Sequence, residues 1–260
     1  MHYDFSLPGF SSRFIPVWRR NFLVWKKLAG SSILGNIADP MISLMAFGYG
    51  LGSLLPSVGG VPYIQFLAAG TVCMSTMNAA TFEALYSAFS RMHVQRTWDG
   101  IMNAPVALED VVLGELTWAA SKSFLSGLAI MIVVWIMGLA GGPQSVLVLG
   151  VVVLIGLAFS AIGLVVNALA RAYDTFTYYF TLVVTPMAFV SGVFFPVTQL
   201  PWWLHAISQA LPLSHAIALA RPLLLGHWPE SPLLHIAVLL LYTLAAAYIA
   251  IVLTRRRLLS

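Results

Sequence analysis

The chain has 260 residues, of which 60% are hydrophobic and only 8% are charged, and its formal net charge is +4. Soluble globular domains carry about 25% charged residues. Because a soluble fold needs polar groups to cover its surface, this composition excludes an ordinary soluble domain. It favours a protein whose surface is solvated by lipid.

The N-terminal segment, residues 1–32, is basic and amphipathic. It contains no apolar signal-peptide core, so we expect the first membrane helix to direct insertion. Phe14, Trp18, Phe22 and Trp25 recur at helical spacing, and the basic residues lie mostly off this stripe. The pattern predicts an interfacial helix in the cytoplasmic headgroup region. A soluble helix packed on a partner is the alternative interpretation.

Six apolar stretches approach the length of about 20 residues that a membrane helix requires. They are Ile33–Leu55, Ile64–Ala88, Thr117–Leu139, Val146–Leu169, Phe176–Phe195 and Leu233–Leu253. We therefore expect an all-α, polytopic membrane protein, with residues 33–260 forming a single six-helix domain.

Positive charge alternates between the connections. The segments Pro56–Tyr63 and Ala140–Ser145 have no charge, whereas Phe89–Leu116 and Ala170–Thr175 carry arginine. Together with the two termini, this arrangement puts every Lys and Arg except Arg221 on one side. By the positive-inside rule, both termini are predicted to be cytoplasmic, in a bacterial inner membrane.

Two stretches depart from a simple helix. Asp39-Pro40 interrupts the first span, which either begins at Pro40 or runs from Ile33 with a kink. Residues 196–230 are rich in proline and contain two apolar pieces, Trp202–Leu211 and Leu213–Leu225, each too short to cross. They predict an outer re-entrant hairpin between the fifth and sixth spans.

Three ionisable residues lie in or beside the predicted spans: Glu83, Glu115 and Lys122. Charges in such positions are costly and are therefore functional candidates. A Glu83–Lys122 or a Glu115–Lys122 pair near the inner surface is expected, either as a structural ion pair or in proton coupling. No acidic residue is predicted at mid-bilayer, which argues against an ion-driven carrier.

The longest cytoplasmic connection, Phe89–Leu116, contains a short amphipathic piece, Arg91–Met102. Trp98 and Met102 offer an apolar contact, with polar residues beside them. A helix of this kind either docks into a groove on a cytoplasmic partner or rests on headgroups. The residues in question are Arg91, Arg96, Thr97, Trp98, Asp99 and Met102.

The motifs of catalysis are missing from the sequence. There is no phosphate-binding G-x-x-x-x-G-K-[ST] loop, no G-x-S-x-G elbow and no metal-ligand spacing among the histidines. We therefore expect no enzyme activity, no metal and no cofactor in this chain. The basic residues flank apolar helices, so nucleic acid is not expected as a partner.

Several blocks, in order, resemble the permeases of type-2 ABC exporters. They include L-G-N-I-A-D-P-M-I-S-L-M-A-F-G-Y-G-L-G-S (Leu34–Ser53), Q-R-T-W-D-G-I-M-N-A-P (Gln95–Pro105) and S-G-V-F-F-P-V-T-Q-L-P (Ser191–Pro201). Within this class the sequence is similar to the nodulation protein J family, permeases of lipooligosaccharide export. The resemblance covers nearly the whole chain.

The resemblance implies an exporter subunit that works as a homodimer with a separate nucleotide-binding ATPase, which binds ATP and Mg. It assigns the coupling helix to residues 91–103 and an amphipathic glycolipid as substrate. Phe194, Phe195, Trp202 and Trp203 are candidates for an outer gate or substrate path, or alternatively for membrane anchoring. Drug or polysaccharide export, a secondary transporter and an intramembrane enzyme using His93 and Asp99 are the rival functions.

Overall fold

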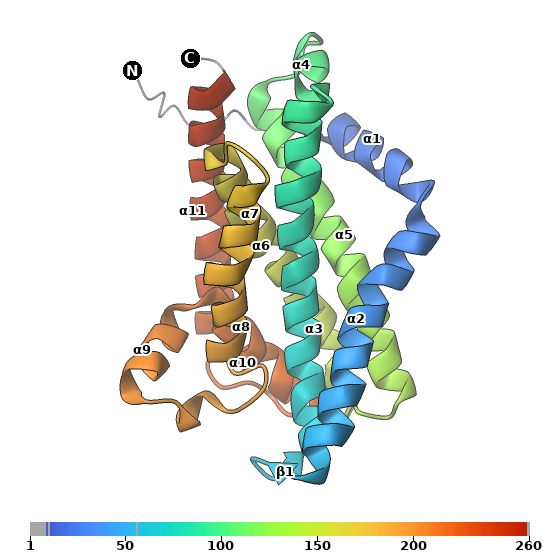
Figure 1. The fold of residues 1–260 in the computed structure, drawn as a ribbon, viewed down its shortest axis with the longest axis vertical. Coiled ribbons are helices and arrows are strands. Elements are labelled where there is room, and N and C mark those ends of the chain that lie inside the picture. The colour runs from blue at the N-terminus through green and yellow to red at the C-terminus, as the bar shows by residue number, and fades with distance from the viewer. Residues whose placement is uncertain (1–8, 10, 56, 259–260) are drawn as a thin grey trace.

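The computed structural model describes residues 9, 11–55 and 57–258, and the chain forms a bundle of helices (Figure 1). Residues 1–8 and 10 of the predicted N-terminal segment, and Pro56 of the first outer connection, lie outside the described residues. The helices are α1 (Phe14–Lys26), α2 (Ala29–Gly50), α3 (Tyr63–Phe82), α4 (Thr97–Met102), α5 (Leu108–Ile136), α6 (Val148–Leu169), α7 (Asp174–Tyr179), α8 (Thr185–Val190), α9 (Trp202–Ala210), α10 (Pro212–Leu224) and α11 (Pro232–Leu258).

Shorter elements join or extend these helices. Strands β1 (Ser57–Val58) and β2 (Val61–Pro62) pair antiparallel between α2 and α3. The single-turn segments are η1 (Leu51–Ser53), η2 (Glu83–Ser87), η3 (Ser90–Val94), η4 (Pro143–Leu147), η5 (Phe180–Val184) and η6 (Val197–Gln199). Of these, η2, η3 and η5 are π-helical.

The predicted first span forms a helix that continues through its proline. Helix α2 runs from Ala29 to Gly50 with Pro40 inside it. Of the two predicted starts, Pro40 and Ile33, the structure is closer to Ile33, and the helix begins four residues before it. Asp39 is consequently near the middle of a 22-residue helix and not at its start.

The predicted loop Phe89–Leu116 is also wrong in extent. The helix that begins at Tyr63 continues through η2 and η3 to Val94, and α5 already begins at Leu108. The predicted spans ended before Arg91 and began after Glu115, whereas the structure pairs these two charges inside the bundle. A π turn inserts one residue into the helical repeat and often marks a functional site.

Helix α6 is the centre of the bundle and packs on α3, α5, α10 and α11. It is apolar on all sides, as a helix surrounded by others should be. The backbone carbonyl oxygens of Ala84 and Leu85 in η2 accept hydrogen bonds from the Asn167 side chain at the end of α6 (2.9 and 3.2 Å). This contact ties the π turn to the central helix.

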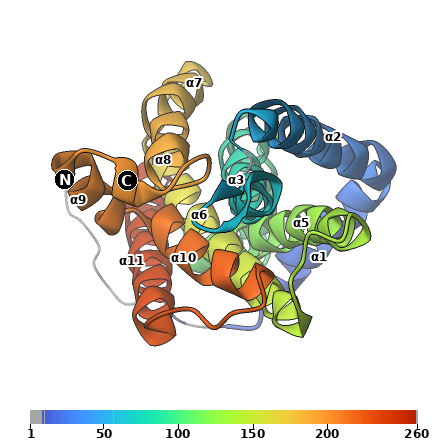
Figure 2. The same ribbon diagram turned by 90° about the horizontal axis from the view of Figure 1, so that it is seen from below.

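Among the described residues, three elements are long and apolar enough to cross a membrane: Leu108–Ile136, Pro143–Leu169 and Pro232–Leu258. The chain is therefore an all-α membrane protein. The short helices α9 and α10 coincide with the two predicted apolar pieces to within one residue at each end. Helix α10 is largely buried against α3, α6 and α11, and Figure 2 shows it crossing beneath the bundle.

The two ends of the bundle differ in character. Helix α1, helix α4 and the C-terminal end of α11 lie at one end, while β1, α9 and α10 lie at the other (Figure 1). Basic residues of α1 and of the last turn of α11 are thus gathered at the α4 end. Arg221, on α10, lies at the opposite end.

Candidate functional site

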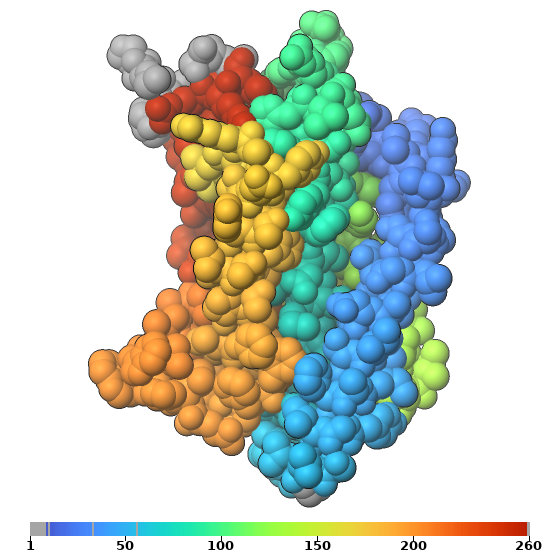
Figure 3. All heavy atoms as spheres, viewed as in Figure 1, coloured from blue at the N-terminus to red at the C-terminus, as the bar shows by residue number. Residues whose placement is uncertain are grey.

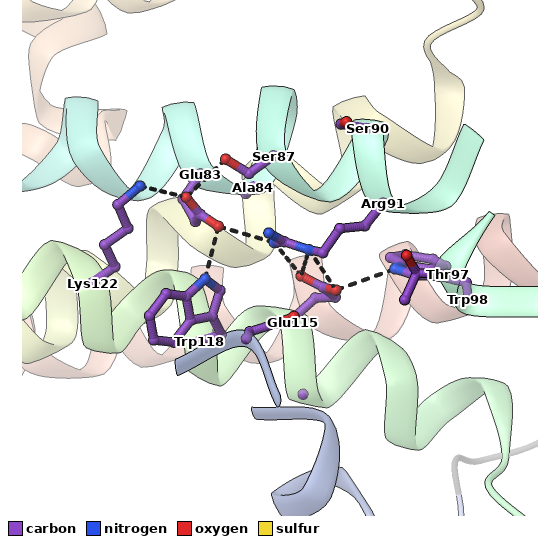
Figure 4. Close-up of polar contacts among 12 residues, drawn as sticks. Glu83, Ala84, Ser87, Ser90, Arg91, Thr97, Trp98, Glu115, Trp118 and Lys122 are labelled. Carbon is purple, nitrogen blue, oxygen red and sulfur yellow. Dashed lines mark hydrogen bonds and ion pairs between the residues drawn. The ribbon is translucent and has the colours of Figure 1, made fainter. Parts of the chain in front are cut away.

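Four charged side chains form a buried cluster just inside the α4 end of the bundle (Figure 4). Arg91 on η3 contacts Glu115 on α5 (Nη2–Oε2 2.5 Å) and Glu83 on η2 (Nη2–Oε1 3.0 Å). Lys122, two turns along α5 from Glu115, contacts the other oxygen of Glu83 (2.7 Å). The cluster therefore links the two long helices on either side of α4.

Uncharged donors complete the cluster. The Trp118 indole donates to Glu83 Oε1 (2.7 Å) and the Ser87 hydroxyl to Oε2 (2.9 Å). The Trp98 indole donates to Glu115 Oε1 (3.2 Å). Each carboxylate oxygen accepts two hydrogen bonds, which is the condition under which buried charges are tolerated. Glu83 and Glu115 are only 2% and 1% exposed.

Of the two predicted pairs, the structure contains Glu83–Lys122, while Glu115 pairs with Arg91 instead of Lys122. Arg91 is thus an internal residue of the cluster, and its predicted place on an exposed amphipathic helix is wrong. The sequence carried no signal for this arrangement, because Arg91 and Glu115 are 24 residues apart. Trp118 was missed for the same reason.

The predicted amphipathic piece Arg91–Met102 is divided into two elements. Arg96 adopts a left-handed conformation (φ 48°) and separates η3 from α4. Trp98 points inward and is buried, so the prediction that it offers a contact to a partner is wrong. Arg96 and Asp99 are exposed, and Thr97 and Met102 are half-buried. Helix α4 therefore has an exposed tip and a buried anchor.

Helix α1 packs on α5 of its own chain. Val17 is buried against Gly114, where a Cβ atom would lie 2.6 Å from the Val17 Cβ. The Trp18 indole donates to the Ser121 hydroxyl (3.0 Å), and Phe22 and Trp25 lie edge-on to Trp118. The predicted stripe, with Phe14 half-buried at its start, thus faces protein.

The residues of α1 that face outward are different from the predicted stripe. Ile15 and Leu23 are each 49% exposed and lie off the face that packs on α5. They are apolar, and they had no part in the interpretation of the sequence. They are therefore the candidates for contact with the membrane interface.

Comparisons with known proteins agree with this architecture. Residues 13–225 match the family model described as ABC-2 type transporter. The chain belongs to the ABC-2 transporter family. It is 45% identical to Nodulation protein J of Sinorhizobium fredii, over 99% of this chain and 98% of the relative. It is 47% identical to Nodulation protein J of Rhizobium leguminosarum bv. trifolii, over 98% and 97%.

A more distant relative is the Inner membrane transport permease YadH of Escherichia coli K12, which is 22% identical over 78% of each chain. Membership of the ABC-2 family makes this chain a membrane transport permease and a transport component, not an enzyme.

The permease contains a cavity of about 230 Å³ between α2, α3 and α5, whose mainly apolar wall carries several polar side chains. Its wall includes Asn36 and Asp39 on α2, Asn78 on α3, and Lys122 and Ser126 on α5. The Ser126 hydroxyl is buried and has no hydrogen-bond partner among the described residues. These polar side chains, set in an apolar wall, can form hydrogen bonds with the hydroxyl groups of a ligand.

The predicted outer aromatic residues do not form one group. Phe194 lies against Phe47 of α2 and Phe189 of α8, with ring centroids 5.7 and 5.1 Å apart. Phe195 is half-buried. Trp202 and Trp203 are exposed on α9, and among the described residues no ring contact joins them to Phe194. The structure thus separates the partly buried Phe194 and Phe195 from the exposed Trp202 and Trp203.

Proposed function

We propose that this chain is the permease subunit of an ATP-driven exporter that moves an amphipathic lipid-linked sugar, such as a lipooligosaccharide, outward across the bacterial inner membrane. The support for the substrate class is the full-length similarity to proteins named Nodulation protein J. The support for the inner membrane is the name of the Escherichia coli relative. The anchored helix α4 is the structural observation that supports coupling to an ATPase.

The proposed topology has six crossings: α2, α3, α5, α6, the continuous helix formed by α7, η5 and α8, and α11. These elements belong to a single transmembrane domain. Helix α2, with 22 residues, is about 33 Å long, which is enough to cross a core of about 30 Å. The basic α4 end is cytoplasmic by the positive-inside rule. Helices α9 and α10 then form the outer re-entrant hairpin.

In the proposed mechanism, a separate ATPase binds ATP and Mg and contacts the exposed tip of α4, including Arg96 and Asp99. Trp98 fixes α4 to Glu115, and Arg91 joins Glu115 to Glu83. A displacement of α4 is thereby passed to α3 and α5 as rigid bodies rather than absorbed by a loop. The ion cluster has a coupling role, not a proton-carrying one, in this proposal.

A second copy of the chain completes the proposed transporter. The outward faces of α2 and of the α7–α8 helix carry large exposed apolar side chains, among them Ile42, Met45, Tyr178 and Leu182. Lipid or a second copy can cover such faces. The polar side chains of the cavity beside α2 supply hydrogen bonds to sugar hydroxyls, and Phe194 and Phe195 line the outer part of the route.

The coupling assignment is tested with the double variant Arg96→Ala/Asp99→Ala. We expect ATP hydrolysis by the assembled complex to continue while export falls at least about tenfold, since the permease no longer follows the ATPase. Arg171→Ala, which removes an exposed charge from another connection, is the matched control and should transport normally. Export by the double variant at the control rate would show that α4 does not couple the subunits.

Drugs and polysaccharides are the alternative substrates for an ATP-driven exporter of this family. A secondary transporter is the candidate from another class, and Asp39 in the middle of α2 is the observation that favours it. Transport in proteoliposomes with the ATPase distinguishes the two. Export that requires ATP and needs no proton gradient supports the ATP-driven function, whereas export driven by a proton gradient alone supports the carrier.

A further inference from the structure

A second cavity, of about 170 Å³, lies between α1 and the ion cluster. Arg20 and Asn21 of α1 form one wall, and Glu83, Arg91, Trp118 and Lys122 form the other. In the space-filling view, α1 and the upper part of α2 stand away from α3, with α5 visible between them (Figure 3). The cavity is distinct from the one beside Asp39, although Lys122 borders both.

The free hydrogen-bonding capacity of this cavity consists of donors. Asn21 is 3% exposed, yet its Nδ2 group has no hydrogen-bond partner among the described residues. Its Oδ1 atom accepts from Arg20 Nη1 (3.0 Å), which fixes the amide orientation and leaves the NH₂ group as the unpaired side. An unmet donor in a buried position is unfavourable unless a ligand meets it.

The carboxylate and amide acceptors on the cavity wall are already engaged in hydrogen bonds. Both oxygens of Glu83 accept hydrogen bonds within the cluster. The Gln95 side chain is engaged with Ser90 and Thr97 (3.3 and 3.4 Å). A ligand that satisfies the remaining groups must therefore present acceptors rather than donors.

The charges around the cavity leave one positive charge in excess. Arg91 and Lys122 are matched by the carboxylates of Glu83 and Glu115. Arg20 contacts only Asn21 and Thr97 through its guanidinium (3.0 and 3.4 Å) and forms no ion pair among the described residues. Burial, followed by the charge of Arg91, lowers the pKa of Arg20 from its ordinary value, although the carboxylate of Glu115 opposes this shift. The cavity thus lacks one counter-anion.

We propose that this cavity binds the phosphodiester group of a membrane phospholipid. A phosphodiester carries a single negative charge and offers several acceptor oxygens, which matches Arg20 and the free Asn21 amide. The position also fits, because α1 carries Ile15 and Leu23, the exposed apolar residues that are candidates for contact with the membrane interface. The bound lipid is a resident ligand that fastens α1 to the ion cluster, and this site is independent of the transported substrate.

Native mass spectrometry of the full-length permease tests the proposal, with phosphatidylglycerol as the probe and diacylglycerol, which lacks phosphate, as the reference lipid. The wild-type protein should retain phosphatidylglycerol and not diacylglycerol. Arg20→Gln and Asn21→Asp should each lower its retention by about tenfold, the factor that corresponds to losing one charge-assisted hydrogen bond. Asn21→Asp keeps the side-chain size and adds a charge that repels phosphate.

Arg19→Gln is the matched control, since Arg19 is the exposed neighbour on the same helix and its replacement changes the net charge equally. It should retain the lipid as the wild type does, and all variants should elute as the wild type in size-exclusion chromatography. Equal retention by Arg20→Gln and Arg19→Gln overturns the proposal. Displacement of the lipid by millimolar inorganic phosphate also overturns it, because the site would then bind a free ion.

Discussion

At the scale of single residues, Arg91 is the centre of the structure that we describe. Its guanidinium contacts carboxylates from two helices, and its side chain is 13% exposed. A cation in this position holds together Glu83 and Glu115, which would otherwise repel each other in a medium of low dielectric. The nearby indoles orient the carboxylates and exclude water. Arg91 therefore has a structural role that could not be predicted from its position in the connection Phe89–Leu116.

We predict that Arg91→Met lowers the free energy of unfolding by about 3–5 kcal/mol, because it leaves two buried carboxylates with one cation. The double variant Arg91→Met/Glu115→Gln should recover part of this loss, since one unpaired charge is removed. Unfolding of the purified protein in detergent, followed by circular dichroism, measures both. A double variant less stable than the single one would contradict the charge argument.

A second residue-scale prediction concerns Trp98. Trp98→Phe keeps most of the buried ring but removes the hydrogen bond to Glu115, and should cost about 1.5–3 kcal/mol of stability, the range for a hydrogen bond to a charged group. Trp203→Phe, at an exposed indole, is the control and should leave the stability unchanged. Chemical denaturation of the two variants in the same detergent provides the comparison.

At the scale of the elements, close approach between helices depends on small residues. Gly156 of α6 faces α5, where a Cβ atom would lie 2.5 Å from the Ser123 hydroxyl and 3.2 Å from the carbonyl oxygen of Ala120. Interfaces between membrane helices use small residues because packing replaces the hydrophobic effect in lipid. Helices α5 and α6 are therefore held at a spacing that a larger side chain cannot occupy.

Gly156→Leu should consequently destabilise the protein by about 1–3 kcal/mol through overpacking. Gly150, on the same helix, has no atom within 4 Å of a Cβ position, so Gly150→Leu serves as the control. The thermal midpoint in detergent is the measurement. Similar midpoints for the two variants would mean that α5 and α6 do not pack as described.

At the scale of the whole molecule, the two ends of the bundle must face opposite compartments if the proposed topology holds. Asp99 and Arg171 belong to connections at the α4 end, and Ser57 and Glu230 to connections at the other end. The single cysteine, Cys73, is fully buried. This arrangement makes single-cysteine labelling a direct test of orientation.

In a Cys73→Ala background, we expect a membrane-impermeant thiol reagent to label Ser57→Cys and Glu230→Cys in intact spheroplasts. It should label Asp99→Cys and Arg171→Cys only after the membrane is permeabilised. The physical reason is that basic connections are retained in the cytoplasm. Labelling of Asp99→Cys in intact spheroplasts would show that the α4 end faces outward, opposite to the proposed orientation.

Local patterns in the sequence were enough for much of the architecture. Apolar length, helical spacing and proline placement predicted α1, α6, α9, α10 and α11 to within a few residues, because lipid imposes its length and polarity on each span separately. The ordered motifs predicted the family. None of these inferences required contacts between distant residues.

Only the tertiary structure decided how the polar residues are used. Arg91 and Trp98 looked like parts of an exposed segment, yet both point into the bundle and bond to Glu115. From the sequence, Asp39 could lie at a helix start or inside a kinked helix; in the structure it lies within α2 and borders a cavity. The hydropathy pattern ended one predicted span before Arg91 and began the next after Glu115. Whether a buried charge finds a partner is decided by residues far away in the chain, and only the packing of α3 against α5 supplies them.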